Sequence, residues 1–262
     1  MSILNYDQTF SFCGQNLSGI SDLTFSSNFG VGLTPTLGVK SFGFHKTGPS
    51  FGSVEFSRSL IYNDPVLAYT GELACSGSFG YNGIAYGFES GYLTNYSIAC
   101  SIGQVPSVSA SISVFGEMKS GAGNQSFVSH PEIFIPSQKS IVIANDYGNS
   151  NRIQSFNWAV STSREPKYSI DSGLTPDGVF TTLPIQISAS ATFNVVGFSP
   201  LDLQQFVRYI YSPNFTINIK NRDLSQTLMT LPVNNAQILG QEIQGTVDSP
   251  LSLTLQYGGY LE

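Results

Sequence analysis

The sequence predicts a mainly β protein built from two tandem domains. Three observations favour this fold. Aromatic residues make up 13% of the 262 residues and are interleaved with 26 glycines and 13 prolines, as expected for strands separated by turns. Apolar and polar residues alternate along much of the chain, which is the period of a half-buried strand. A ten-residue pattern also occurs twice, which indicates a duplication.

The repeated pattern is Glu72–Tyr81, and its second copy is Gln186–Val195, at an offset of 114 residues (186 − 72 = 114). The same offset places Val39–Phe42 over Ile153–Phe156. Two matches in one register predict a duplicated domain. The alternative is that strands rich in serine and glycine resemble one another at any offset.

The duplication leads to two predictions, one about the repeated strands and one about the domain bounds. Phe79 and Phe193 are expected at equivalent core positions of superposable domains, because each is the eighth residue of its copy of the pattern. The segment Lys119–Ser126 has the small polar composition of a linker, so the domains are predicted to be residues 1–120 and 121–262.

Strands are expected throughout both domains. In the first, Asn82–Gly83 is a strong hairpin signal, and Ser90–Gly91 is expected to be a turn. The expected strands are Phe10–Cys13, Leu23–Phe25, Lys40–His45, Ser53–Ser57, Glu72–Tyr81, Ile84–Phe88, Tyr92–Ile102, Val108–Val114, Ile141–Ala144, Ile153–Ser161, Gln186–Val195, Phe215–Ile219 and Leu251–Leu255.

One α-helix is expected in the second domain, near residues 200–211. Ser199 is a favourable N-cap, Pro200 suits the first helical position, and Asp202 complements the helix dipole. Leu203, Phe206, Val207 and Ile210 follow at the spacing of one apolar helix face.

The charge of the chain excludes some functions. Its net charge is −6 and it has no run of Lys or Arg, so tight nucleic-acid binding is not expected. The sequence shows no charged segment followed by an apolar run and no stretch of about 18 apolar residues, so neither a signal peptide nor a membrane span is expected. Charged residues make up 11%, against about 25% in ordinary domains. This composition suits a surface that is buried between subunits.

The three cysteines, Cys13, Cys75 and Cys100, are odd in number and fit no metal-binding spacing. Cys75 and Cys100 are expected to be buried thiols rather than a disulfide, in a protein made in a reducing cytoplasm.

The sequence predicts no catalytic, cofactor-binding or metal-binding residue. The two histidines, His45 and His130, have no orienting partner at a suitable spacing. Glu55, Glu72 and Glu89 could form the carboxylate pair of a glycosidase, but they fall on outward faces of expected strands.

Arg58 and Arg164 each follow a serine at the end of an expected strand. An arginine at such a position could pair with an acid of a neighbouring subunit, so both are candidate interface residues. The alternative is that they are ordinary surface arginines.

Two parts of the chain resemble bacteriophage tail proteins. The segment 153–195 runs from Ile-Gln-Ser-Phe-Asn-Trp to Ile-Ser-Ala-Ser-Ala-Thr-Phe, and the segment 88–116 is similar to the late strands of tail tube subunits. The resemblance implies tail-tube-like β-sandwiches and a structural virion protein without enzyme activity or cofactors. Copies of such a protein would form stacked rings and contact other tail proteins. DNA would pass through the rings without specific binding, and the protein would not contact a membrane.

A tube subunit with one sandwich would need six copies to close a sixfold ring. A chain with two sandwiches closes a similar ring with three copies, so a homotrimer with pseudo-sixfold symmetry is expected, made in the host cytoplasm and located in the virion tail. The alternatives are a distal tail, neck or other ring-forming tail component, and a lectin-like receptor-binding β-sandwich.

Overall fold

The computed structural model describes residues 9–17, 19–35, 42–46, 48–60, 64, 66–67, 70, 73–81, 84–120, 141–145, 148–150, 153–171, 175–194, 214–220, 224–246 and 249–261. Within these ranges the protein is mainly β and antiparallel, as the sequence predicts, and contains no α-helix. The expected helix near residues 200–211 lies outside the described residues, as does most of the expected linker. Its first two residues, Lys119 and Ser120, form a short strand.

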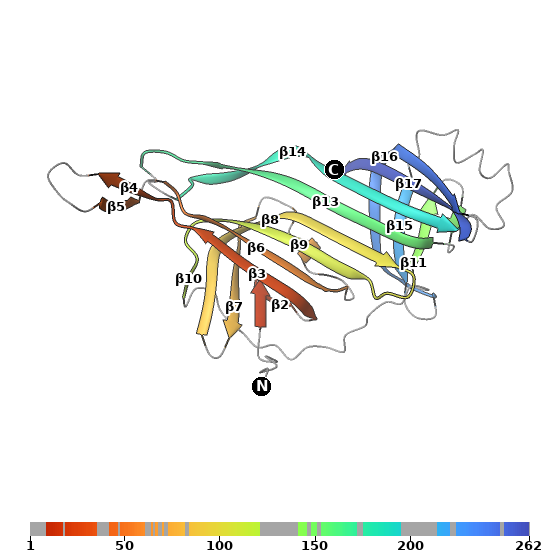
Figure 1. Ribbon diagram of the computed structural model, residues 1–262, viewed down its shortest axis with the longest axis horizontal. Coiled ribbons are helices and arrows are strands. Elements are labelled where there is room, and N and C mark those ends of the chain that lie inside the picture. Colours follow the sequence, from red (N-terminus) through yellow and green to blue (C-terminus); the bar gives the residue numbers. More distant parts are fainter. Residues whose placement is uncertain are drawn as a thin grey trace.

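The strands of the first half are β1 (Thr9–Phe12), β2 (Gln15–Leu17), β3 (Ile20–Asn28), β4 (Val31–Pro35), β5 (Phe42–Lys46), β6 (Phe51–Ser59), β7 (Cys75–Tyr81), β8 (Ile84–Ser101), β9 (Ser107–Phe115) and β10 (Lys119–Ser120). Those of the second half are β11 (Ile141–Asn145), β12 (Gly148–Ser150), β13 (Ile153–Lys167), β14 (Gly178–Asn194), β15 (Asn214–Lys220), β16 (Thr227–Thr246) and β17 (Ser249–Leu261). All belong to one 15-stranded sheet except β4 and β5, which form a separate hairpin that projects from one end of the molecule (Figure 1).

The strand order of the sheet occurs twice. In the first half the paired neighbours follow the order β2-β1-β7-β8-β9-β6-β3, and in the second half they follow β12-β11-β15-β16-β17-β14-β13. Each strand of one order therefore has a counterpart in the other, from β1 and β11 to β9 and β17, whereas β4, β5 and β10 have none. The two sets are joined where β8 pairs with β13.

Matching irregularities fix the register between the two sets. The β3–β6 ladder shifts between Ile20 and Asp22, and the β13–β14 ladder shifts between Ile153 and Ser155, an offset of 153 − 20 = 133 residues. The β8–β9 ladder shifts between Leu93 and Asn95, and the β16–β17 ladder between Ile238 and Gly240, an offset of 238 − 93 = 145. Bulges at corresponding places indicate that the counterparts share geometry as well as order.

The register of 114 residues expected from the sequence is therefore wrong. By pairing, β14 is the counterpart of β6, and β7 is the counterpart of β15. Phe79 in β7 and Phe193 in β14 consequently do not occupy equivalent positions. Their similarity reflects two Ser- and Gly-rich strands, the alternative that the sequence left open.

Each half folds back on itself into two facing layers. In the first half the Phe10 ring of β1 lies 5.9 Å from Phe25 of β3 and 5.4 Å from Phe56 of β6. In the second half the Phe215 ring of β15 stacks on Tyr257 of β17 at 4.0 Å. Because these strands are not neighbours in the sheet, their contacts show β-sandwich packing, with the apolar core between the layers.

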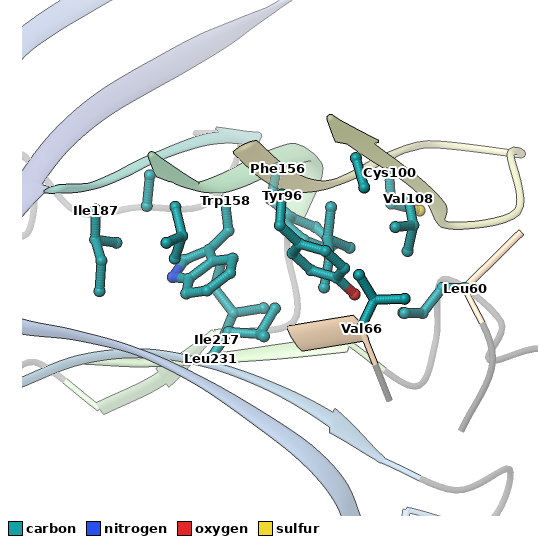
Figure 2. Close-up of a cluster of buried hydrophobic side chains, with 14 of the residues drawn as sticks. Leu60, Val66, Tyr96, Cys100, Val108, Phe156, Trp158, Ile187, Ile217 and Leu231 are labelled. Atoms are coloured by element: carbon teal, nitrogen blue, oxygen red, sulfur yellow. The ribbon is translucent and has the colours of Figure 1, made fainter. Parts of the chain in front are cut away.

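The core continues across the joint between the halves. Trp158 of β13 is 1% exposed, and its Nε1–H donates a hydrogen bond to the Pro232 carbonyl of β16 at 3.1 Å. Figure 2 shows Trp158 pointing toward Ile217 and Leu231, with Tyr96 of the neighbouring strand β8 beside Val66. Buried side chains of both halves belong to a single hydrophobic cluster.

Candidate functional surface: the open face of the central layer

Eight strands form a continuous layer that spans both halves, in the order β3-β6-β9-β8-β13-β14-β17-β16. Side chains on one face of this layer alternate with those on the other. One face packs on the core and carries buried residues such as Val54, Ile98, Trp158 and Leu255. On the opposite face Tyr92, which pairs with Ser113, is buried, whereas the polar residues named below are not, and we call this surface the open face.

The open face is lined mainly by polar side chains, together with the aromatic residues Phe51, Tyr92, Phe115 and Tyr260. One row of paired residues crosses the layer as Asp22, Ser57, Ser109, Ser97, Ala159, Ser188 and Gly258. The neighbouring rows add Thr24, Ser26, Asn28, Ser53, Glu55, Ser59, Asn95, Ala99, Ser101, Ser107, Ser111, Ser113, Ser155, Asn157, Ser161, Gln186, Ser190, Thr192, Asn194, Gly240, Glu242, Gln244, Ser252, Thr254 and Gln256.

Hydroxyl groups of adjacent strands bond to each other across the open face. The Oγ atoms of Ser26 and Ser53 lie 2.8 Å apart, and the Oγ1 atoms of Thr192 and Thr254 lie 3.0 Å apart. Such cross-strand pairs hold the side chains down on the sheet and satisfy part of their hydrogen-bonding capacity. These serine and threonine side chains therefore lie close to the sheet.

The charged side chains in the rows named above have one sign. They are Asp22, Glu55 and Glu242, and no Lys or Arg occurs among the residues named above. A surface of this kind attracts neither phosphate groups nor other anions.

Arg58, a predicted interface residue, lies inside the chain. Its side chain is 0% exposed and forms an ion pair with Asp64, whose side chain is also 0% exposed. The Asp64 Oδ1 atom accepts a further hydrogen bond from the Val66 N–H at 2.9 Å. The partner of Arg58 in this structure therefore belongs to its own chain, and its guanidinium does not reach the surface.

Tyr96 lies beside this ion pair and is fully buried. Burial raises the pKa of Tyr96 well above its ordinary value of 10.0, and the nearby Asp64 carboxylate raises it further, while the Arg58 charge acts in the opposite direction. The phenol therefore stays protonated throughout the neutral range.

Arg164, the second predicted interface residue, is half-buried and links the two halves of the chain. Its Nη2 donates to the carbonyls of Leu93 and Thr70 at 3.0 Å, and its Nη1 donates to Thr181 Oγ1. Its guanidinium also lies 5.7 Å from the centre of the Tyr92 ring. These contacts hold β13 against the first half.

The cysteines differ from the expectation of free thiols. Cys13 and Cys75 form a disulfide, with their Cα atoms 4.9 Å apart, while Cys100 is free and buried. The prediction of a buried position for Cys75 and Cys100 is confirmed, but the prediction of a free thiol is wrong for Cys75. The bonded pair was missed because Cys13 follows β1 and meets Cys75 only through the β1–β7 ladder.

The remaining candidate residues form no site in the described part of the chain. Glu55 lies on the open face, and Glu89 forms an exposed ion pair with Lys119 at 3.4 Å. Glu72 and His130 lie outside the described residues, and His45 belongs to β5. No group of three or more His, Cys, Asp or Glu side chains among the described residues could hold a metal ion.

No family model matches the chain, and no curated protein matches it. A search of the described residues for a helix long and apolar enough to span a membrane finds none.

Proposed function

We propose that the protein is a structural virion protein, a tail tube subunit whose copies form stacked rings around a conduit for viral DNA. The observation that carries the proposal is the open face. Duplex DNA carries about one negative charge per 1.7 Å of its axis. The polar rows named above carry three acids and no basic residue and therefore offer DNA no counter-charge, so DNA can move along them without being held.

The repeated strand order supports the proposed duplication. Two tail-tube-like β-sandwiches, residues 1–120 and 121–262, would each present half of the eight-stranded layer. The second of them would carry the helix near residues 200–211. Three copies, each with two equivalent sandwiches, would close a ring with pseudo-sixfold symmetry. The low charge of the chain suits subunits that bury much of their surface against other copies and other tail proteins.

Electron microscopy of the purified chain at increasing concentration tests the proposal. We expect hollow tubes whose repeating ring contains three chains by native mass measurement. Isolated rings that never stack would instead favour a distal tail or neck component. A monomer at every concentration would contradict both, and would return the lectin-like binding module as the alternative, to be tested with a glycan array.

A further inference from the structure

The eight-stranded layer has an open strand at each edge. Within the described part of the chain, β3 pairs with β6 alone, and the second half of β16, Gln237–Thr246, pairs with β17 alone. Each of these edges presents a row of unpaired backbone N–H and C=O groups, which is a template for pairing with another strand.

The chain itself contains a joint between strands equivalent to these two edges. β13 is the counterpart of β3, and the second half of β8 is the counterpart of the second half of β16. At the joint β13 and β8 pair antiparallel over seven consecutive positions, from Ser155 opposite Ser101 to Ser161 opposite Asn95. The counterparts of the two strands that are open at the ends of the layer are therefore paired with each other in its middle.

We propose that β3 of one copy pairs with Gly240–Thr246 of a second copy in the register of this internal joint. The offsets of 133 and 145 residues place Asp22 opposite Thr246, Phe25 opposite Ile243, and Asn28 opposite Gly240. The inference rests on the proposal that copies of this chain form a ring, and it names the surfaces that join them.

Side chains on the core side of the proposed joint fit this register. At the internal joint Trp158 lies opposite Ile98, and both are buried, at 1% and 0% exposure. Their counterparts are Phe25, which is half-buried, and Ile243, which is 50% exposed. Pairing of the two edges covers Ile243 with Phe25 and restores the packing that the internal joint already has.

The open face would continue across the proposed joint. Thr24 comes to lie opposite Gln244 and Ser26 opposite Glu242, so polar groups face polar groups and no two like charges are directly opposed. Because the joint connects different edges of the two copies, it is a head-to-tail contact, which closes into a ring when the rotation between neighbours is repeated.

Paired cysteine substitutions test the register. Ser26→Cys combined with Glu242→Cys places thiols directly opposite each other on the open face, with Cβ atoms about 5 Å apart. Mild oxidation of the assembled protein is expected to link most chains head to tail, into species that end at a covalent trimer on non-reducing gels. The matched control, Ser27→Cys with Glu242→Cys, shifts one thiol by one residue and therefore to the opposite face. We expect at least tenfold less cross-linking there.

A second variant tests the joint without oxidation. Ile243→Lys places an ammonium opposite Phe25, and the exposure of Ile243 in the single chain allows the fold to form. We expect the midpoint concentration of ring formation to rise at least tenfold with an unchanged thermal unfolding midpoint. The control Leu73→Lys adds the same charge at a 74% exposed position outside the joint and is expected to assemble like the unsubstituted chain.

The outcomes separate the joint from the function. Rings without preferential cross-linking of the Ser26/Glu242 pair would overturn the joint and leave the tail assignment standing. Closed covalent trimers that never stack into tubes would support the joint and contradict a tube subunit. A chain that stays monomeric overturns both.

Discussion

Arg58 and its counterpart show that one core position accepts two chemical solutions. By strand pairing Arg58 corresponds to Phe193, at an offset of 193 − 58 = 135 residues, and both side chains are almost completely buried. A buried ion pair loses solvation that its mutual attraction only partly replaces. The phenyl ring at the same place in the second half indicates that the fold does not require a charge there.

Removing one partner of the ion pair is therefore expected to cost more than removing both. Arg58→Ala leaves the Asp64 carboxylate buried without its counter-charge and should lower the free energy of unfolding by about 3–5 kcal/mol. The double variant Arg58→Met with Asp64→Leu should lose much less or gain stability. Urea denaturation measures both, and a double variant as unstable as Arg58→Ala would contradict this account.

Tyr96 predicts a specific loss of stability at alkaline pH. Its pKa is raised above 10.0 in the folded protein, so the folded state keeps a proton that the unfolded state releases. This contribution is complete below about pH 10 and is lost as the pH rises toward the folded-state pKa, at up to about 1.4 kcal/mol per pH unit. Tyr96→Phe should flatten the decline in unfolding free energy between about pH 9 and about pH 11. Parallel declines for both proteins would show that Tyr96 is not responsible.

The surroundings of Arg58 could not be inferred from the sequence. Its position near the end of an alternating strand predicts a surface residue, and alternation alone does not tell which acid reaches it. Asp64 lies in the connection after β6, where the chain returns over the core. A loop carries no periodicity, so its contacts become visible only in three dimensions.

At the scale of elements, β8 explains why Ser90–Gly91 is not the expected turn. β8 runs without interruption from Ile84 to Ser101. A Cβ atom on Gly91 would lie 2.3 Å from the Phe88 ring, and one on Gly77 would lie 2.4 Å from it. These two glycines make room for the buried Phe88 ring rather than for a change of chain direction. Glycine that serves packing is easily mistaken for glycine that serves a turn.

The two phenylalanines that the sequence placed in equivalent strands are expected to differ in energy. Phe193 is 1% exposed, whereas Phe79 is half-buried and packs beside the Phe25 ring at 5.7 Å. Phe193→Ala should cost about 3–5 kcal/mol, and Phe79→Ala clearly less, because less apolar surface is lost and a smaller cavity remains. Equal losses in chemical denaturation would contradict the structural difference between their positions.

Alternation located most strands but missed the long strand β16, the short strands β2, β4, β10 and β12, and the true repeat. In β16 the register shifts three times against β17, and Asn235 has a φ of 49°, so the apolar residues do not keep a period of two. The offset between the halves also grows from 133 to 145 residues because the connections between strands differ in length. No single offset can align halves of that kind, whereas strand pairing aligns them directly.

At the scale of the whole molecule, the charge of the open face is the property that the proposed conduit depends on. Ser53 and Ser188 occupy equivalent positions on this face in the two halves (188 − 53 = 135). Ser53→Lys with Ser188→Lys would place basic groups along the lumen. Assembled tubes should then retain duplex DNA at low salt, with affinity on the order of tenfold or more above the unsubstituted tubes and falling as salt rises.

Two controls isolate the position of the added charge. Gln226→Lys adds a lysine at an exposed position beside β16, away from the open face, and should raise DNA retention much less. Ser53→Gln with Ser188→Gln changes size without charge and should not raise it. Equal retention by the lysine variants at both positions would show that the open face does not line the path of the DNA.

The most direct test of the central claim is a three-dimensional reconstruction of the assembled protein by electron cryomicroscopy, with the chain traced through the wall. The account predicts three chains per ring, with the eight-stranded layers of neighbouring copies joined edge to edge and the open face lining the lumen. A wall in which the open face lies at the outer surface or between rings, whatever the number of chains, would contradict it.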